Sequence, residues 1–227
     1  MKLGWDSKTG LNRTCKSWRN QNDPSSGYFT FIIQLDGLPQ VIIRGGSVIK
    51  NRAGQWYNGR FSGSDPLGDT AVYSTKFEYS ADEVTYSYEA RSSLFIRFEL
   101  SSIGDVWDEG KKILASGKSP EAWGNYTGSD GCVRSKSQIC GNGEGFEAFG
   151  SVKLPDSSGQ LVNVNKSTEE CEVACLENCS CLAYGTMELS TGGYGCVTWF
   201  QELIDVRNVL AENGQILYVR VGQVREK

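Results

Sequence analysis

The sequence contains no histidine among its 227 residues. This absence removes the commonest general base, the Ser-His and Cys-His nucleophile pairs, and the commonest nitrogen ligand for zinc, copper and iron. An enzyme could still use carboxylates or lysine, but the composition argues against catalysis. We therefore expect no catalytic residues, no metal site and no cofactor.

The chain also lacks a long apolar run and an excess of basic charge. No run approaches the roughly 20 apolar residues needed to span a bilayer, and the first ten residues, MKLGWDSKTG, lack the apolar core of a secretory signal. The formal net charge is −4, so the sequence lacks the excess of basic residues that is typical of nucleic-acid-binding proteins. We expect no membrane span, no signal peptide in the chain as written and no nucleic-acid partner. The length suits one or two domains.

Cysteine, by contrast, is abundant, with eight residues against two methionines. Four cysteines lie between Cys171 and Cys181 with the spacing C-x3-C-x3-C-x-C. Structural zinc sites usually present paired C-x2-4-C knuckles, and a redox site needs C-x-x-C or one activated thiolate. Zinc binding and redox chemistry stay as alternatives, but the spacing favours structural disulfides, which are typical of proteins made outside the cytosol.

The first hundred residues repeatedly alternate apolar and polar side chains. Such alternation predicts antiparallel strands with one buried face. The segments are residues 28–35, 73–79, 84–90 and 94–100. Because only Arg91–Ser93 separates the last two, we expect a hairpin there and a three-strand meander from the last three segments.

The pattern changes in the second half of the chain. From Asp105 to about Lys136 the sequence is rich in glycine, serine and charge, and predicts a linker or irregular segment. Ser167 followed by Glu170 matches a capping box and predicts a helix that projects Cys171 and Cys175 from one face. The later runs CLAY, CVTWF and ILYVRV predict strands, so this part is expected to be a small α+β module.

Several motifs together resemble one family. The segment CEVACLENCSCLAYG, followed by GCVTWFQELIDVRN and GQILYVRV, resembles the PAN/apple domain of plant S-locus glycoproteins and S-domain (G-type lectin) receptor-like kinases. Upstream, MKLGWDSKTGLNRTCKSWRNQNDPSSGYFTF resembles the second lectin-like segment of that family, and GCVRSKSQICGNGEGFEAFGSVKLPD falls in the family's order. The resemblance covers nearly the whole chain. It implies a mainly β fold: an antiparallel β-rich lectin-like region, then a disulfide-stapled PAN/apple domain with one helix on an antiparallel sheet.

The resemblance also implies a domain layout. We expect a partial lectin-like region at residues 1–107, a linker in place of an EGF-like module at 108–136, and the PAN/apple domain at 137–223. The first lectin domain, the EGF-like module, the transmembrane helix and the kinase of full-length receptors are expected to be missing from the chain as written.

Disulfide pairing is a further implication of the resemblance. The family pattern joins three pairs: Cys171–Cys196, Cys175–Cys181 and Cys140–Cys179. Cys132 would ordinarily pair into the EGF-like module, and Cys15 stands where the family usually has an apolar residue. We expect these last two to be unpaired unless the fold brings their Cα atoms within roughly 7 Å.

The sequence offers a few candidate surface sites. N-x-S/T sequons occur at Asn12, Asn125, Asn165 and Asn178; we expect Asn178 to be unused because it lies between the helix end and cysteines. A sugar- or peptide-binding loop at 52–63 is possible, but a structural turn that packs Trp56 on the sheet is favoured. The mannose signature Q-x-D-x-N-x-V-x-Y is absent around Asp36, and Trp199 is expected to pack on the helix.

The resemblance implies an extracellular, non-catalytic recognition region at the plasma membrane. Its partners would be a protein or small cysteine-rich peptide, or a second copy in a homodimer, in recognition of pollen or in defence signalling. One alternative is a carbohydrate-binding lectin module. A second alternative is a piece of a receptor serine/threonine kinase whose kinase domain lies elsewhere. A third is a truncated remnant of such a protein that has no stable N-terminal half.

Overall fold

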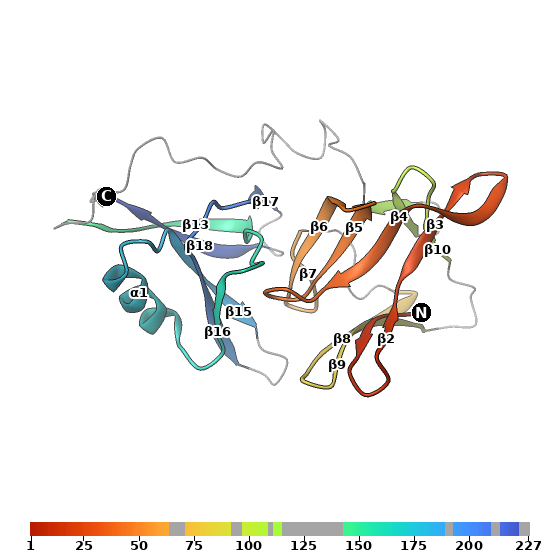
Figure 1. The fold of residues 1–227 in the computed structure, drawn as a ribbon. Helices are drawn as coiled ribbons and strands as arrows, with labels where there is room; N and C mark the ends of the chain where they lie inside the picture. The colour runs from red at the N-terminus through yellow and green to blue at the C-terminus, as the bar shows by residue number, and fades with distance from the viewer. Residues whose placement is uncertain are drawn as a thin grey trace. The chain divides into compact units, whose positions relative to one another are not determined.

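A computed structural model describes residues 1–63, 71–91, 97–108, 111–114, 143–188, 193–209 and 214–222 (Figure 1). The chain divides into two compact units. The N-terminal unit comprises Met1–Leu35 and Pro39–Tyr126, and the C-terminal unit comprises Asp36–Leu38 and Thr127–Lys227. The expected linker at 108–136 lies mostly outside the described residues, so its boundaries stay a prediction.

The described part of the N-terminal unit is built from antiparallel strands. Their bounds are β1 Lys2–Asp6, β2 Leu11–Arg13, β3 Cys15–Asn20, β4 Asp23–Gln34, β5 Gln40–Gly45, β6 Val48–Tyr57, β7 Arg60–Phe61, β8 Tyr73–Tyr79, β9 Glu83–Ala90, β10 Phe98–Leu100, β11 Val106–Asp108 and β12 Lys111–Leu114. They form three sheets with the orders β2-β1-β9-β8, β3-β4-β5-β6-β7 and β10-β11-β12.

The alternation in the sequence accounts for the core of this unit. Phe31 and Ile33 of β4 are buried, as are Val84 and Tyr86 of β9, and they join one apolar cluster. Leu35, the last residue of the predicted 28–35 strand, lies beyond the end of β4 and is exposed. Burying one face of each strand in this way supplies most of the driving force for folding.

The prediction that residues 52–63 form a structural turn agrees with the packing of Trp56. Strands β6 and β7 form a hairpin around Asn58-Gly59, whose positive φ angles of 49° and 77° suit a tight two-residue turn. Trp56 stacks on Phe77 with ring centroids 5.2 Å apart and meets Phe61 edge-on at 5.0 Å. Trp56 therefore contributes to the core cluster.

The expected three-strand meander is wrong in its third strand. β8 and β9 pair as predicted, with Phe77 opposite Tyr86. The other neighbour of β9 is β1, with Trp5 opposite Val84, while residues 98–100 form β10, which pairs with β11. A partner from the start of the chain thus takes the place expected for the next segment.

The expectation of an irregular segment from Asp105 is also wrong at its start. Val106–Asp108 and Lys111–Leu114 form the antiparallel pair β11 and β12. The residues from 115 to 142 lie outside the described part of the chain.

The C-terminal unit has one described helix and a six-stranded antiparallel sheet (Figure 1). The sheet order is β14-β16-β15-β18-β13-β17. The bounds are β13 Gly145–Lys153, β14 Leu161–Asn163, α1 Thr168–Glu177, β15 Ala183–Glu188, β16 Tyr194–Trp199, β17 Arg207–Asn208 and β18 Gln215–Val221. The predicted α+β module is confirmed.

The helix begins where the sequence predicts. Ser167 is the N-cap: its Oγ accepts from the Glu170 N–H at 3.2 Å, and the Ser167 N–H donates to the Glu170 carboxylate at 2.7 Å. Each group satisfies a backbone N–H that a helix terminus leaves unpaired. The capping box therefore fixes the start of α1 and the rotation that turns Cys171 and Cys175 inward.

The sheet separates two apolar clusters in this unit. Cys171, Cys175 and Cys196 lie in one cluster with the helix, whereas Trp199 lies in the other, with Leu154 and Leu217. The expectation that Trp199 packs on the helix is wrong, because successive side chains of β16 point to opposite faces and Cys196 occupies the helix side. The Trp199 indole N–H donates to the Asp156 carbonyl at 2.9 Å.

Candidate functional site

Two disulfides tie the helix region of the C-terminal unit together. Cys171 on α1 is bonded to Cys196 on β16, with Cα atoms 6.5 Å apart. Cys175, one turn further along α1, is bonded to Cys181 just before β15, with a Cα separation of 5.2 Å. Both distances suit a disulfide, and both pairs are those that the resemblance implied.

The remaining cysteines are only partly described. Cys179 is disulfide-bonded, but Cys140 and Cys132 lie outside the described residues, so the Cys140–Cys179 pair and the state of Cys132 stay predictions. Cys15, which lies in the N-terminal unit, is a free thiol.

Polar contacts also hold α1 against the sheet. The Tyr184 hydroxyl on β15 donates to the Glu172 carboxylate at 3.0 Å, and burial together with that carboxylate raises the pKa of Tyr184 well above its usual range. The Thr168 and Thr186 hydroxyls lie 2.9 Å apart. The Tyr184 ring stacks on Tyr218 of β18 at 4.6 Å.

A buried arginine lies at the C-terminal end of α1. α1 has no basic residue in its own last turn. Arg220 of β18, with 2% of its surface exposed, donates to the carbonyls of Leu176 at 2.6 Å and Asn178 at 2.8 Å. Its Nε also pairs with the Glu144 carboxylate at 3.2 Å. A cation placed on the last helix carbonyls satisfies groups that the helix leaves unpaired and opposes the negative end of the helix dipole.

A second buried charge lies near β13 and β17. The Lys153 ammonium is fully buried and lies 3.0 Å from the Asp205 carboxylate, and it also donates to the Asp205 carbonyl at 2.9 Å. Asp205 has a positive φ of 62°, which aspartate and asparagine tolerate better than other residues with a Cβ. The pair joins β13 to the turn before β17.

The sequons differ in their surroundings. Asn12 on β2 and Asn165 before α1 are exposed, and Asn125 lies outside the described residues. Asn178 is exposed too, but its side chain accepts from the Ser180 N–H at 3.0 Å and its carbonyl from Arg220. Its use for glycosylation stays a prediction, and the local hydrogen bonds suit the expectation that it is unused.

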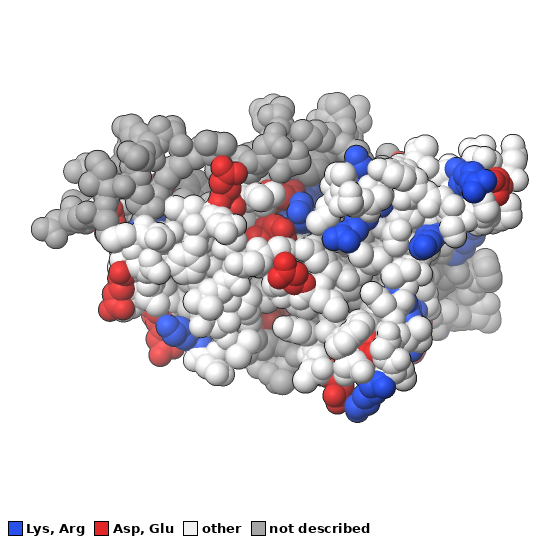
Figure 2. All heavy atoms as spheres, viewed as in Figure 1, with Lys and Arg blue, Asp and Glu red and all other residues white. Residues whose placement is uncertain are grey.

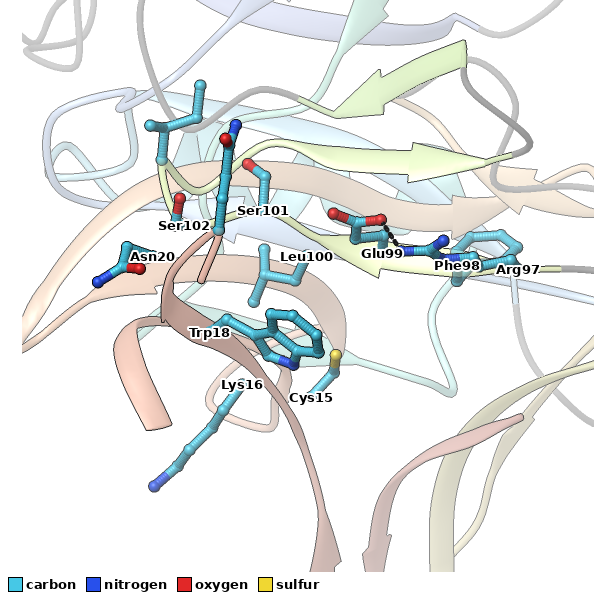
Figure 3. A pocket seen from close by; sticks show the side chains of 12 residues that line it. Cys15, Lys16, Trp18, Asn20, Arg97, Phe98, Glu99, Leu100, Ser101 and Ser102 are labelled. Carbon is cyan, nitrogen blue, oxygen red and sulfur yellow. Dashed lines mark hydrogen bonds and ion pairs between the residues drawn. The ribbon is translucent and has the colours of Figure 1, made fainter. Parts of the chain in front are cut away.

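The N-terminal unit contains a groove between β3 and the segment around β10, which we call the β3–β10 groove (Figure 3). Its volume is about 790 Å³. Among the apolar residues of the lining, Leu100 belongs to the core cluster, and Cys15 and Phe98 pack against it. Trp18, which is 54% exposed, lies beside Cys15.

Strand β3 presents Trp18 through a bulge. The register of β3 against β4 shifts on both sides of Trp18, and a Cβ on Gly27 of β4 would clash with the Trp18 carbonyl oxygen. Because bulges bend a strand and redirect a side chain, the glycine allows the close approach that sets the direction of the indole. Trp18 is not among the candidate residues predicted from the sequence, although a tryptophan within the polar segment CKSWRN is a usable signal.

The Cys15 thiol in this groove is less acidic than an exposed cysteine. Burial raises the pKa of Cys15, and a hydrogen bond with the Leu100 backbone only partly opposes this effect. At the rim, Arg97 forms an ion pair with Glu99. Within the described residues no group of three or more cysteine, aspartate or glutamate side chains could hold a metal ion.

Comparisons with known proteins place these features in a family. Residues 140–206 match the PAN-like domain model. The chain is 35% identical to the receptor-like serine/threonine-protein kinase SD1-8 of Arabidopsis thaliana over 98% of its own length and 31% of the kinase. It is 31% identical to the S-locus-specific glycoprotein BS29-2 of Brassica oleracea var. alboglabra, over 98% of its own length and 60% of that protein. The chain is a homologue of S-locus glycoproteins and G-type lectin S-receptor-like kinases.

The homology covers a part of these relatives. Against another relative, the G-type lectin S-receptor-like serine/threonine-protein kinase SD1-1 of Arabidopsis thaliana, the identity is 31% over 98% of the chain and 33% of the kinase. The chain thus spans about a third of the receptor kinases that it matches. Among the described residues no helix combines the length and apolar character needed to cross a membrane.

Proposed function

We propose that this chain is a non-catalytic extracellular recognition region that binds a protein or small cysteine-rich peptide, or a second copy of itself. The observation that carries the proposal is the homology along 98% of the chain to receptor kinases of which it spans 31–33%. In those kinases the catalytic domain would lie outside the segment that matches. We expect the chain itself to transfer no phosphoryl group.

The exposed face of α1 is the surface that we propose for a protein ligand. Val173 is 56% exposed and Leu176 is 37% exposed. Four glutamates lie on the same helix, whose sequence is TEECEVACLE, and Figure 2 shows acidic side chains over the region of α1. An apolar centre with an acidic surround suits a partner that presents basic side chains around an apolar patch. The disulfides from the buried face of α1 hold this surface rigid, which lowers the entropy cost of binding.

The proposal is tested with chain secreted from a eukaryotic host and a displayed library of small cysteine-rich peptides. We expect binders enriched in basic residues, and at least a tenfold loss of affinity in Val173→Asp, since an introduced carboxylate would be buried unpaired at the interface. Leu161→Asp is the matched control, because Leu161 is 54% exposed on β14 of the same unit. Sedimentation analysis measures self-association in parallel.

The outcome that would contradict the proposal is equally definite. A folded chain that stays monomeric and retains no library member at about 10 μM would be no recognition module of this kind. Binders that lose affinity in Leu161→Asp but not in Val173→Asp would place the surface elsewhere and overturn the assignment to α1.

A further inference from the structure

Three residues of the connection between β4 and β5 belong to the C-terminal unit. Asp36–Leu38 pack with this unit, whereas the chain up to Leu35 and from Pro39 belongs to the N-terminal unit. β4 ends at Gln34 and β5 begins at Gln40, so a single residue on each side joins the segment to a paired strand. The mannose signature is absent from this segment, and its packing indicates a different role.

The side chain of Leu38 is part of the core of the C-terminal unit. It is 5% exposed and belongs to the apolar cluster that contains Leu154, Trp199 and Leu203. Burial of this side chain removes apolar surface from water and thereby stabilises the unit. Leu38 lies outside residues 140–206, which match the PAN-like domain model. The core of the unit is therefore completed by a residue from outside the matched segment.

Polar contacts fix the position of the same segment. The Leu38 N–H donates to the hydroxyl of Ser157 at 2.8 Å, and Ser157 is buried. The Gly159 N–H donates to the Asp36 carboxylate at 3.4 Å. Gly37 has a φ of 75°, and a Cβ at this position would clash with the Ser157 carbonyl oxygen, so the close approach requires glycine. The connection between β13 and β14 thus holds Asp36–Leu38 in one specific place.

We propose that Asp36–Leu38 is a docking segment that makes the stability of the C-terminal unit depend on the β4–β5 hairpin. Because only Leu35 and Pro39 separate the segment from the two strands, separation of β4 from β5 would withdraw Leu38 from the core. The C-terminal unit would then contain an apolar cavity, and the buried Ser157 hydroxyl would lose its backbone donor. Opening of the hairpin and opening of the C-terminal unit are therefore linked. This dependence does not rest on ligand binding at α1.

The test uses amide hydrogen exchange of the whole chain, which measures the opening of each strand. We expect Leu38→Ala to accelerate exchange in β16 and β18 by about tenfold or more, since the deletion leaves a cavity. Ser157→Ala should accelerate it in the same strands and keeps the test decisive if Leu38→Ala does not fold. Leu38→Met preserves the apolar volume and should stay within about threefold of the wild type. Leu35→Ala is the matched control, because Leu35 is exposed in the same connection, and should exchange like the wild type.

A double-mutant cycle distinguishes a docking segment from an ordinary core residue. Ile43→Ala removes a fully buried side chain of β5 from the core cluster of the N-terminal unit and should loosen the hairpin. We expect Ile43→Ala to accelerate exchange in β16 and β18 by about tenfold in the wild type, but by less than about threefold in Leu38→Ala, where the link is already lost.

Two outcomes would overturn the proposal. One is unchanged exchange in β16 and β18 for both Leu38→Ala and Ser157→Ala. The other is an effect of Ile43→Ala that stays within the N-terminal unit or is equal in the two backgrounds. Val173→Asp should leave the exchange rates of β16 and β18 unchanged, so a failure of the proposal for α1 is distinguishable from a failure of this one.

Discussion

The guanidinium of Arg220 donates a hydrogen bond of 2.6 Å to the carbonyl of Leu176, 44 residues away in the sequence. The contact places a buried positive charge from the sheet at the C-terminal end of α1. It stands in for the basic residue that the last turn of the helix lacks. The helix is thereby held at its start by its own capping box and at its end by a strand that follows it by 38 residues, since α1 ends at Glu177 and β18 begins at Gln215.

Replacement of Arg220 should therefore be costly. We expect Arg220→Ala to lower the free energy of unfolding by about 3 kcal/mol or more, because partly buried carbonyls lose a charged donor and the buried Glu144 carboxylate loses its partner. Arg220→Lys should recover only part of the loss, since an ammonium cannot reproduce the planar fork. Urea unfolding measures both, with the exposed Arg19→Ala as control. Equal effects of Arg220→Ala and Arg19→Ala would show that the contact contributes nothing.

The two described disulfides should differ in their contribution to stability. Cys171–Cys196 closes a loop with a sequence separation of 25, against 6 for Cys175–Cys181. Loop-closure entropy predicts a loss of about 3–4 kcal/mol for Cys171→Ser/Cys196→Ser and about 2 kcal/mol for Cys175→Ser/Cys181→Ser. Denaturant unfolding under non-reducing conditions tests the order, and Cys15→Ser serves as a thiol control without a bond. A reversed order would show that native packing outweighs chain entropy.

The buried Lys153–Asp205 pair gives a third test. Asp205→Asn keeps the shape and tolerates the positive φ of this position, but leaves a fully buried ammonium without its counter-ion. We expect a loss of about 3–5 kcal/mol in the free energy of unfolding. Asp82→Asn breaks an exposed pair with Lys8 and should change it by less than about 1 kcal/mol. Similar losses in the two variants would contradict the importance of burial.

The reactivity of Cys15 should depend on pH in a particular direction. Burial raises the pKa of this thiol, and the thiolate is the reactive form. At neutral pH the folded chain should therefore contain less Cys15 thiolate than an unfolded chain, and iodoacetamide should label it more slowly. Labelling should accelerate only as the pH rises above the usual cysteine range. Peptide mapping of folded and urea-unfolded chain measures the two rates, and faster labelling of the folded chain would refute the direction.

How much of the fold was predictable depends on the range of the interactions. Ser167 and Glu170 lie three residues apart, so their capping box is visible in the sequence, and the alternation of β8 and β9 is equally local. The neighbour of β9 is a strand from the start of the chain, and no local pattern distinguishes that pairing from a meander. The disulfide pairs were predictable only through resemblance, since spacing alone does not fix connectivity.

The residues of the candidate sites were also only partly predictable, because local sequence patterns do not show which strands become neighbours. Trp199 lies on the opposite face of the sheet from Cys196, because the two residues are three positions apart on β16 and side chains at that spacing point to opposite faces of a strand. The β3–β10 groove joins residues about eighty positions apart, and the carbonyls of Leu176 and Asn178 that Arg220 contacts lie 44 and 42 residues before it in the sequence. Such sites depend on which strands become neighbours, and that outcome is decided by the packing of the whole unit.

The hydroxyl of Ser167 has one further consequence. It caps α1 in the folded chain, and it is also the third residue of the Asn165-Lys166-Ser167 acceptor sequence. Glycosylation of Asn165 stays a prediction; if a transferase acts there, we expect its use of this hydroxyl to compete with the hydrogen bond from the Glu170 N–H. Attachment of a sugar at Asn165 would then be faster before the first turn of the described helix closes.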